Sequence, residues 1–487
     1  MDSVGQRNRL HNWREIISRD DSASLAFFVG AIILLVLGVT EGLIMVFQFV
    51  FPDFLAGIPW LVFGRIRQSH TNTVMFGFLS MGQMGFWYFV VPRLTGRKLW
   101  SETLGVAAAL LWGLAVAAGV TLELFGFSQG REYAEMVYAV DVAVVVVCIL
   151  NVINLFMTIS KRVEQKLYAV LWYIIGALMW FPLLYFIGNV MWEVPTGALT
   201  GINDSIFNWF YGHNVLGLWF TPGLLPVIYF LVPRETQTPL YSHFLSLIAF
   251  WGLVIFYTGV GAHHLEWAPI PYWLKTIAVA ESIGMAITIV AFMMNIWLTM
   301  RGNWNKIATS IPLRFAVLSW AAYVLVSFQG THQALRSVNL LTHFTQYVTA
   351  HAHLSLLLFG ASAVMAAAYY CIPRILHVSI FSRTLANVGF IVYVIGFTFF
   401  FGGFLLVGLT QGTDWVHLGL PVWTTLPGIR PYLSLRAAGG SVLWVGFILF
   451  VYNILATIIL RRPEVVAPTV YQPQAQPGLV TSEPPAS

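Results

Sequence analysis

The stretch VTAHAHLSLLLFGASAVMAAAYY, residues 348–370, decides how this chain is read. It is apolar over a length that suits a membrane-spanning helix, which needs about 20 residues. Near its start it carries His351 and His353, separated only by Ala352. On an α-helix, residues two positions apart point roughly 200° apart, at about 100° per residue. The two histidines therefore cannot bind one metal together, but each can bind a different metal on its own side of the helix.

Two interpretations of this pair remain open at this point. A polar side chain in hydrocarbon is costly unless it is satisfied, so two imidazoles on an apolar helix need partners. They are either metal ligands or core histidines bonded to neighbouring hydroxyls. The positions of the other histidines in the chain distinguish these two interpretations.

The composition is that of a membrane protein. Of 487 residues, 58% are hydrophobic and 9% are charged, which excludes an ordinary soluble domain. The apolar runs are longer than a barrel strand requires, so we expect a bundle of helices. Cys148 and Cys371 both lie in apolar runs, which excludes a disulfide framework, and no Cys-x-x-Cys-His sequence offers covalent haem attachment. We attribute the basic pI to loops on the inner side and expect no nucleic-acid partner.

Apolar runs of spanning length predict twelve transmembrane helices in an all-α polytopic fold. They lie near residues 24–50, 70–93, 103–126, 136–160, 167–189, 207–232, 242–262, 273–299, 313–331, 347–373, 384–408 and 437–460. Lys and Arg are more numerous in the two tails and in the loops after even-numbered helices than in the other loops. The positive-inside rule then places both termini in the cytoplasm.

The chain divides into three parts. We expect residues 1–22 to form a polar cytoplasmic segment without a cleavable signal pattern, and residues 23–462 to form one twelve-helix membrane domain. Residues 463–487 are rich in Pro, Gln, Ala and Ser and are expected to be a disordered tail. Residues 409–436 are expected to form a long outer loop, which is either a docking surface for a partner or a plain interfacial loop.

Six histidines converge toward the outer side of the predicted bundle. They are His70, His213, His263, His264, His351 and His353. The predicted topology puts them at the outer ends of four helices, and imidazole is a preferred ligand of copper and of haem iron. Three of them suit one copper ion, and the other three suit two haem irons.

Two details refine this scheme. His263 and His264 splay about 100° on a regular helix, so binding one ion requires a distortion at that helix end. Tyr257 precedes His264 by two helical turns, which predicts the same helix face about 10 Å deeper. A phenol beside a copper–haem pair can supply a proton and an electron. Considered without the histidines, Tyr257 would be interpreted as a buried tyrosine whose hydroxyl has a hydrogen-bond partner.

These motifs resemble subunit I of the haem-copper oxygen reductases, and most closely the C family, the cytochrome cbb(3) type. The resemblance rests on five segments: His70-Thr71-Asn72, Trp209–Asn214, Gly261–Leu265, Val338-Asn339 with His343, and His351-Ala352-His353. The segment Gly130–Glu135 resembles the same family's outer segment. The likeness extends from about residue 60 to 460 and implies the fold of that subunit.

The resemblance implies a role for each of these residues. His70 and His353 would be the axial ligands of a low-spin haem b, and His351 the proximal ligand of a high-spin haem b. His213, His263 and His264 would bind copper B. Tyr257 would be the active-site tyrosine cross-linked to His213. In other oxidase families that tyrosine lies on the helix of His213, where this chain has Gly217.

The resemblance also implies less central sites. A proton path from the cytoplasm would use Tyr229, Tyr241 and Ser246. Residues near the haem propionates and a calcium ion would be Glu132, Glu135, Arg336, His343 and Arg436. In one place the chain departs from the family: a usual glutamate is replaced by Gln329, which cannot carry the same charge near the proximal haem.

The implied function is that of a terminal respiratory oxidase in a bacterial inner membrane. It would reduce O2 to water with electrons from cytochrome c, delivered by haem c-bearing subunits, with proton uptake from the cytoplasm and proton pumping. Nitric oxide reductase of the same superfamily is the alternative, although that chemistry favours a carboxylate at the position of Gly217. A transporter with structural haem is a third interpretation, but Glu41, Asp141 and Glu281 are too scattered to form its site.

Overall fold

The computed structural model describes residues 19–191 and 201–460. Its regular elements are helices, apart from an isolated bridge between Arg131 and Ala134. The α-helices are α2 (Ser22–Val50), α3 (Phe63–Asn72), α4 (Ser80–Thr95), α5 (Glu102–Leu124), α6 (Tyr138–Ser160), α7 (Ala169–Tyr185), α8 (Ile202–Val215), α9 (Thr221–Thr236), α10 (His243–Tyr257), α11 (Tyr272–Met300), α12 (Ile311–Gln333), α13 (Arg336–Thr342), α14 (Gln346–His353), α15 (Ser362–Leu376), α16 (Arg383–Gly412) and α17 (Val422–Leu460). The all-α polytopic fold is thus confirmed.

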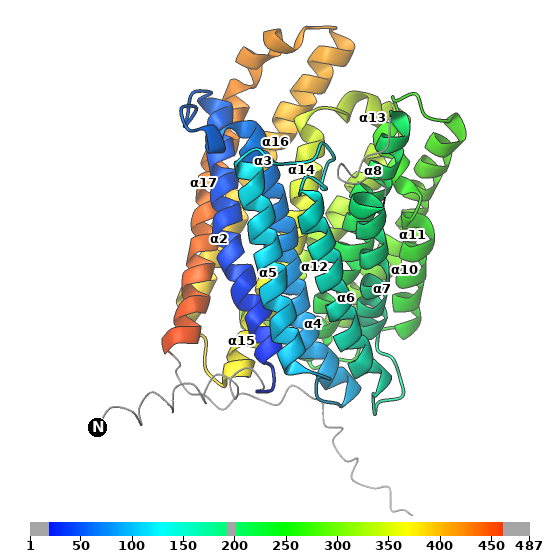
Figure 1. The fold of residues 1–487 in the computed structure, drawn as a ribbon, viewed down its shortest axis with the longest axis vertical. Helices are drawn as coiled ribbons and strands as arrows, with labels where there is room; N and C mark the ends of the chain where they lie inside the picture. The colour runs from blue at the N-terminus through cyan, green and yellow to red at the C-terminus, as the bar shows by residue number, and fades with distance from the viewer. Residues whose placement is uncertain (1–18, 192–200, 461–487) are drawn as a thin grey trace, which may run out of the picture.

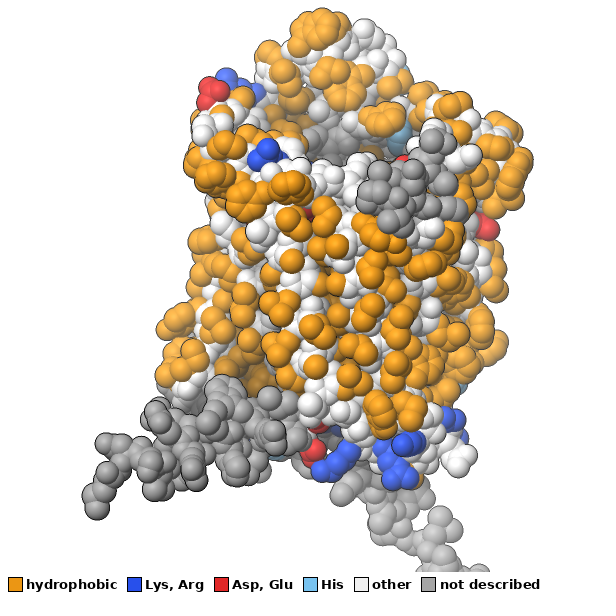
Figure 2. Space-filling view, in the orientation of Figure 1, with side chains coloured by type: hydrophobic (Ala, Val, Ile, Leu, Met, Phe, Trp, Pro, Cys, Tyr) orange, Lys and Arg blue, Asp and Glu red, His pale blue; other side chains and the backbone are white. Residues whose placement is uncertain are grey.

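The bundle has the dimensions of a membrane domain. In the described ranges, eleven helical stretches are long and apolar enough to cross a bilayer, and α10 is a shorter apolar helix of fifteen residues. The count of twelve therefore stays a prediction, with α10 as the additional crossing. The start of α2 and the end of α17 lie at the same end of the bundle (Figure 1). Figure 2 shows a broad hydrophobic belt, with Lys and Arg gathered below it.

Three of the histidine-bearing helices change their winding directly after the histidines. π-helical turns follow α3, α8 and α14, at Thr73–Leu79 (η2), Leu216–Phe220 (η4) and Leu354–Ala361 (η7). The helices then continue as α4, α9 and α15. Extra-wide turns inside helices occur often at functional sites, because they re-aim side chains. Further π turns lie at Phe186–Val190 (η3) and Thr413–His417 (η8), and 3-10 turns at Pro59–Leu61 (η1), Val260–Leu265 (η5) and Trp304–Ala308 (η6).

Two helix starts lie earlier than the sequence predicted. The second crossing begins at Phe63 and the sixth at Ile202, both before the apolar runs begin. His70 and His213 are therefore near the C-terminal ends of α3 and α8 rather than in the first two turns of their helices. The hydropathy signal missed these starts because the first turns carry polar residues such as Arg65, Arg67 and Asn203.

The prediction of a long loop at residues 409–436 was wrong. α16 continues to Gly412 and α17 already begins at Val422, so the segment is an extended helical hairpin. It projects beyond the rest of the bundle, drawn in orange at the top of Figure 1. The two helices pack closely along their shared length, since a Cβ on Gly403 or Gly439 would meet the backbone of the other helix. This mutual packing sustains the helices past the apolar run, despite Pro427 and Pro431.

Candidate metal and haem sites

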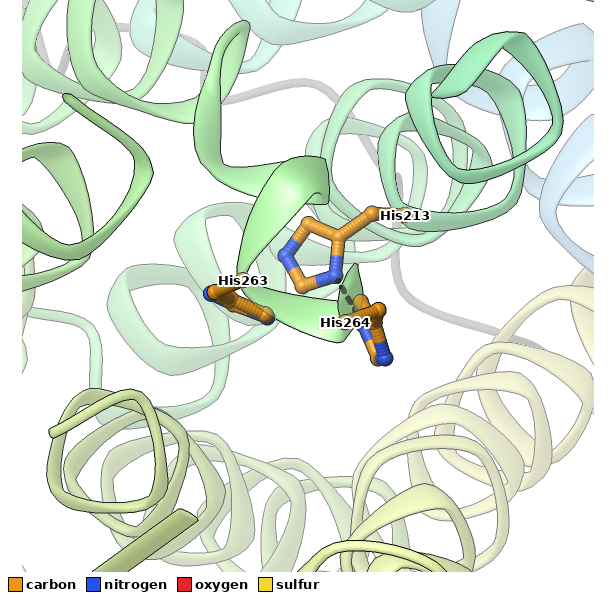
Figure 3. A group of neighbouring side chains, drawn as sticks. All are labelled: His213, His263 and His264. Atoms are coloured by element: carbon orange, nitrogen blue, oxygen red, sulfur yellow. Dashed lines mark hydrogen bonds between the residues drawn. The ribbon is translucent and has the colours of Figure 1, made fainter. Parts of the chain in front are cut away.

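The three predicted copper ligands come together at the end of α10. That helix stops at Tyr257, and the 3-10 turn η5 carries His263 and His264. His213 reaches the same place from α8, and ligand nitrogens of the three rings all lie within 4.8 Å of one another (Figure 3). Adjacent residues of a 3-10 turn splay by about 120°, so the winding itself does not bring the two rings together. Their ligand nitrogens nevertheless converge with that of His213, where the chain has departed from regular α-helix after Tyr257. The three imidazoles can thus form a metal site without further backbone movement.

Neighbouring side chains hold these rings in place. The indole of Trp209 stacks on His264, with ring centroids 3.8 Å apart and planes 8° apart. Nδ1 of His263 lies 2.9 Å from the hydroxyl of Ser282 on α11, and Nδ1 of His213 lies 2.9 Å from Nε2 of His264. A ligand histidine is commonly oriented by a partner on its other ring nitrogen, and Ser282 fills that role for His263. No sequence signal pointed to Ser282, because it is on a different helix from its partner.

Tyr257 lies against His213. Their ring centroids are 4.9 Å apart and their planes differ by 22°. The expectation of a phenol two turns deeper, on the face of His264, assumed a continuous helix. Because α10 ends at Tyr257, the chain between it and His263 is not regular α-helix. The phenol therefore packs beside the first ligand of the cluster rather than beneath the last.

Gly217, on the helix of His213, leaves the space that the ring of Tyr257 fills. A Cβ built on Gly217 would overlap the ring of Tyr257. The helix of His213 thus leaves room for a phenol that arrives from α10. A tyrosine at position 217 and one at position 257 exclude each other in this packing.

These side chains line one cavity of about 600 Å³. It is bordered by His213, His263, His264, Tyr257 and, from α14, His351. Nδ1 of His351 lies 3.3 Å from the side-chain oxygen of Gln329, the residue that replaces the family's glutamate. With Nδ1 used in this way, Nε2 is the nitrogen left for a ligand.

His353 lines a second cavity, of about 440 Å³, together with His70. Nδ1 of His70 lies 2.7 Å from the carbonyl oxygen of Gly38, and Nδ1 of His353 lies 2.8 Å from that of Thr349. Both rings can donate from Nδ1 to a carbonyl, which leaves the two Nε2 atoms as acceptors toward a metal. The rings of Phe400 and Phe404 flank His353.

α14 forms a wall between the two cavities. Ala352 lines both of them, while His351 lines one and His353 the other. The i, i+2 spacing therefore places the two imidazoles on opposite sides of one helix, as elementary helix geometry requires. Within the described residues, the partners of the two rings are the side chain of Gln329 and the carbonyl of Thr349 rather than the hydroxyls that the alternative of two core histidines assumed.

The predicted outer residues have different surroundings. Glu132 and Glu135 form ion pairs with Arg67, and Glu132 lines both cavities. Arg436 is buried in the wall of the His70 cavity, where it contacts the rings of Phe49 and Phe404.

His343 borders the His351 cavity, and partial burial lowers its pKa. Arg336 borders neither cavity, since its guanidinium bonds to Glu266, Tyr272 and Thr276.

The predicted proton-path residues differ in how exposed they are to solvent. Tyr229 is buried, with its ring 5.3 Å from that of Tyr173. Ser246 is buried and donates to the carbonyl of His243, whereas Tyr241 is 59% exposed. Tyr323, which borders the His351 cavity, is linked to Tyr229 by the ring of Phe292 between them. Tyr173 and Tyr323 were missed, because a tyrosine in an apolar helix carries no distinguishing spacing.

Comparison with known families assigns the chain. Residues 22–442 match the model of the family described as cytochrome C and quinol oxidase polypeptide I. The chain belongs to this family. The match covers every histidine discussed above, so both cavities lie within the family's domain. Because members of this oxidase family carry haem and copper, the chemistry of the two histidine-lined cavities agrees with the assignment.

Relatives of this oxidase subunit include two that match most of its length. The cbb3-type cytochrome c oxidase subunit CcoN1 of Stutzerimonas stutzeri is 29% identical, over 88% of this chain and 93% of the relative. A cytochrome c oxidase subunit 1 homolog of Bradyrhizobium diazoefficiens is 28% identical, over 93% and 84%. One of the subunits of nitric oxide reductase from Stutzerimonas stutzeri is 27% identical, over 72% and 74%.

A solved haem-copper terminal oxidase dimer has the same fold as this oxidase subunit. The TM-score is 0.75 at 17% sequence identity, and the superposition covers 91% of this chain and 85% of the other. At that identity the likeness concerns the fold alone. It agrees with the bundle derived above from the apolar runs.

Proposed function

We propose that this chain is the catalytic subunit of a terminal respiratory oxidase that reduces O2 to water with electrons from cytochrome c. The observation that carries the proposal is the pair of cavities on either side of α14, one lined by His70 and His353 and the other by His351 and the three-histidine cluster. The first suits a low-spin haem b held from both faces. The second suits a high-spin haem b facing copper B.

The side chains fit these groups chemically. His70, His351 and His353 each have Nδ1 near an acceptor oxygen, so Nε2 remains for iron. Arg436 is a buried cation for which no ion pair exists within the described residues, and a haem propionate supplies the missing negative charge. The cluster His213, His263 and His264 offers three neutral nitrogen ligands with no carboxylate among them, a set suited to copper.

When bound, the haem iron and copper would transfer to O2 electrons that come from cytochrome c. The chain contributes orientation and proton chemistry around them. Trp209 and Ser282 fix the rings of His264 and His263, and a preorganised site loses no energy in reordering its ligands. The phenol of Tyr257 is held beside His213, where it is placed to donate a proton and an electron. The resemblance adds a covalent cross-link between these two residues.

The remaining parts of the proposal concern the setting of the site. The chain would span the bacterial inner membrane with both termini in the cytoplasm, and haem c-bearing subunits would bring electrons from cytochrome c. Protons would come from the cytoplasmic side by way of Tyr229, Tyr241 and Ser246, and turnover would be coupled to proton pumping. Each elementary charge moved across the membrane corresponds to about 2.3 kcal/mol per 100 mV.

Nitric oxide reductase is the second candidate, supported by the similarity to a relative that carries that enzyme's name. Its non-haem iron would favour a carboxylate ligand near the three histidines. At Gly217 the ring of Tyr257 fills the space that such a side chain would need. This contact favours copper and the oxidase.

Metal analysis of the purified protein separates the two candidates. The oxidase requires two irons and one copper per chain, and the reductase requires three irons and no copper. A CO-binding difference spectrum of the reduced protein should also show one of the two haems open to an external ligand. Two bis-histidine haems with no CO signal would contradict both candidates.

A further inference from the structure

A set of buried carboxyl groups lies next to the His70 cavity, and one of them, Glu123, has no part in the function above. Glu123, at the end of α5, has no exposed surface. It meets the side-chain amide of Asn72, which is 1% exposed, at an Nδ2–Oε1 distance of 2.6 Å. The same Nδ2 lies 3.2 Å from the carboxylate of Glu135. One amide thus bridges two buried carboxyl groups, which we call the Asn72 bridge.

The charges around the Asn72 bridge do not balance. Arg67 forms ion pairs with Glu135 and Glu132, but within the described residues Glu123 has no ion-pair partner. The charged groups that act on Glu123 are Glu135, Glu41 and Asp141, and all of them are acidic. A second arginine, Arg65, bonds to the carbonyl of Leu124 instead. Two ionised carboxylates on the bridge would therefore leave one buried negative charge uncompensated, which is strongly unfavourable.

The bridge also lacks hydrogen-bond donors. Oε2 of Glu123 and Oδ1 of Asn72 are buried and accept no hydrogen bond. On α2, Glu41 accepts from Ser69 at 2.5 Å, but its second oxygen is likewise without a donor. Buried acceptors almost always have a partner, so the missing component is a donor hydrogen. A proton on Glu123 turns one of these unpartnered acceptors into a hydroxyl and removes the excess charge at the same time.

A metal ion would be the other way to balance these oxygens. Within the described residues, however, the group of acidic or histidine ligands that come within 4.8 Å of one another is the three-histidine cluster, and the carboxyl groups do not form one. Asp141 is already bonded to the hydroxyl of Tyr185 and the amide of Gln129. The spread of the carboxyl groups therefore favours a proton over a shared cation.

We propose that the Asn72 bridge is a proton-binding site, with the proton carried by Glu123, and that its proton affinity rises when the neighbouring low-spin haem gains an electron. The second half rests on the proposed function. Asn72 is two residues from His70 on α3, and Arg67, which lines the His70 cavity, pairs with Glu135. One electron added on the haem side makes the bridge region more negative, so one proton is bound more tightly there. When the haem is oxidised again, the proton affinity of Glu123 falls back and the proton can be released.

The route for this proton leads to the outer side. Glu135 and Glu132 are held side by side by their shared partner Arg67, and the side chain of Glu132 is 38% exposed. Arg67 positions the two carboxylates but does not carry the proton, because a guanidinium stays protonated. Glu135 is outside the membrane-spanning helices, and burial raises its pKa, although the charge of Arg67 acts in the opposite direction. Glu135, joined to Glu123 through the amide of Asn72, is therefore the neighbouring carboxyl group that can accept a proton released from Glu123 on the way to solvent. The Asn72 bridge exchanges protons on the side opposite to the proposed uptake path.

Infrared spectroscopy of the whole enzyme tests the proposal. A buried carboxylic acid gives a C=O stretching band distinct from that of a carboxylate, and the band shifts in D2O. In a pH-difference spectrum, which requires no turnover, we expect this band in the wild-type protein and its loss in Glu123→Gln. In the reduced protein we expect the band to persist to higher pH, by about one pH unit for a tenfold change in proton affinity.

The matched control is Glu102→Gln. Glu102 begins the same helix α5, 21 residues before Glu123, which corresponds to about 30 Å along the helix. This variant should leave the band and its redox shift unchanged. If Glu123→Gln fails to assemble, Glu123→Asp keeps the acid and should move the band to a new frequency.

A band that is unchanged in both Glu123 variants would overturn the proposal, as would a divalent cation bound per chain and lost in Glu123→Gln. A band that is lost as expected but does not shift with haem reduction would overturn only the redox linkage. Because the pH-difference spectrum needs no electron transfer, it remains informative even if the copper and haem analysis contradicts the proposed oxidase.

Discussion

The ring of Tyr257 occupies the space that a side chain on Gly217 would need. These residues come from different helices, α10 and the π turn η4. The missing side chain on one helix and the phenol on the other are therefore parts of one arrangement. The phenol consequently reaches His213 from the side, at a ring distance of 4.9 Å.

Substitution of Gly217 by alanine should displace this phenol. The added Cβ would overlap the ring of Tyr257, so the ring has to move away from His213. We expect normal haem content and a large loss of oxygen-reduction rate, measured with reduced cytochrome c and an oxygen electrode. Gly402→Ala on α16 is the matched control, because its Cβ would meet nothing within 4 Å. Equal activity in both variants would mean that the position of the ring is unimportant.

Removal of the phenol oxygen alone should separate binding from chemistry. Tyr257→Phe keeps the ring stacked on His213 but cannot donate a proton and an electron. We expect both haem spectra and the copper content to be retained while turnover is abolished. Tyr272→Phe, an exposed tyrosine at the start of α11, should keep its activity. Oxygen reduction at the normal rate in Tyr257→Phe would exclude the proposed role.

The two histidines of α14 should give different spectroscopic losses. His353→Ala removes a ligand from the His70 cavity, and His351→Ala removes one from the cavity of the copper cluster. We therefore expect the first variant to lose the low-spin haem signal and the second to lose CO binding at the high-spin haem. Reduced-minus-oxidised and CO difference spectra measure the two effects. Loss of the same signal in both variants would contradict the assignment of the two cavities.

Removal of the buried charge of Arg436 should change the potential of the low-spin haem. A nearby positive charge favours the reduced haem, which carries one positive charge less than the oxidised form. Arg436→Met keeps the apolar contacts with Phe49 and Phe404 but removes the charge, so the midpoint potential should fall by an amount on the order of tens of millivolts. Spectroelectrochemical titration measures this shift. Arg430→Met, on the exposed hairpin, should leave the potential unchanged.

The sequence predicted the bundle well, because apolar runs of spanning length have few other solutions in a membrane. It also placed His351 and His353 correctly on two sides of a helix, since their spacing alone determines that geometry. It failed at the hairpin of residues 409–436, where prolines suggested a loop and packing between α16 and α17 prevailed.

The details of the site depend on local breaks and on contacts between helices. The depth of Tyr257 was predicted from a regular α-helix, whereas the chain leaves α-helix after Tyr257, so that depth stays a prediction. The contacts of Ser282 with His263 and of Glu123 with Asn72 each join residues that are distant in sequence. Such contacts depend on how helices lie against one another, which hydropathy and periodicity do not encode. Gln329 was recognisable as unusual, but its 3.3 Å separation from His351 required coordinates.

Ala352 borders both cavities, so a single peptide stretch sets the spacing of the two redox centres that we propose. Electron tunnelling slows steeply with distance, and a spacing carried by neighbouring residues of one helix barely changes when the surrounding bundle flexes. Docking of an electron donor on the outer surface should therefore alter how fast charge enters the protein while leaving the internal hop between the centres at a constant rate.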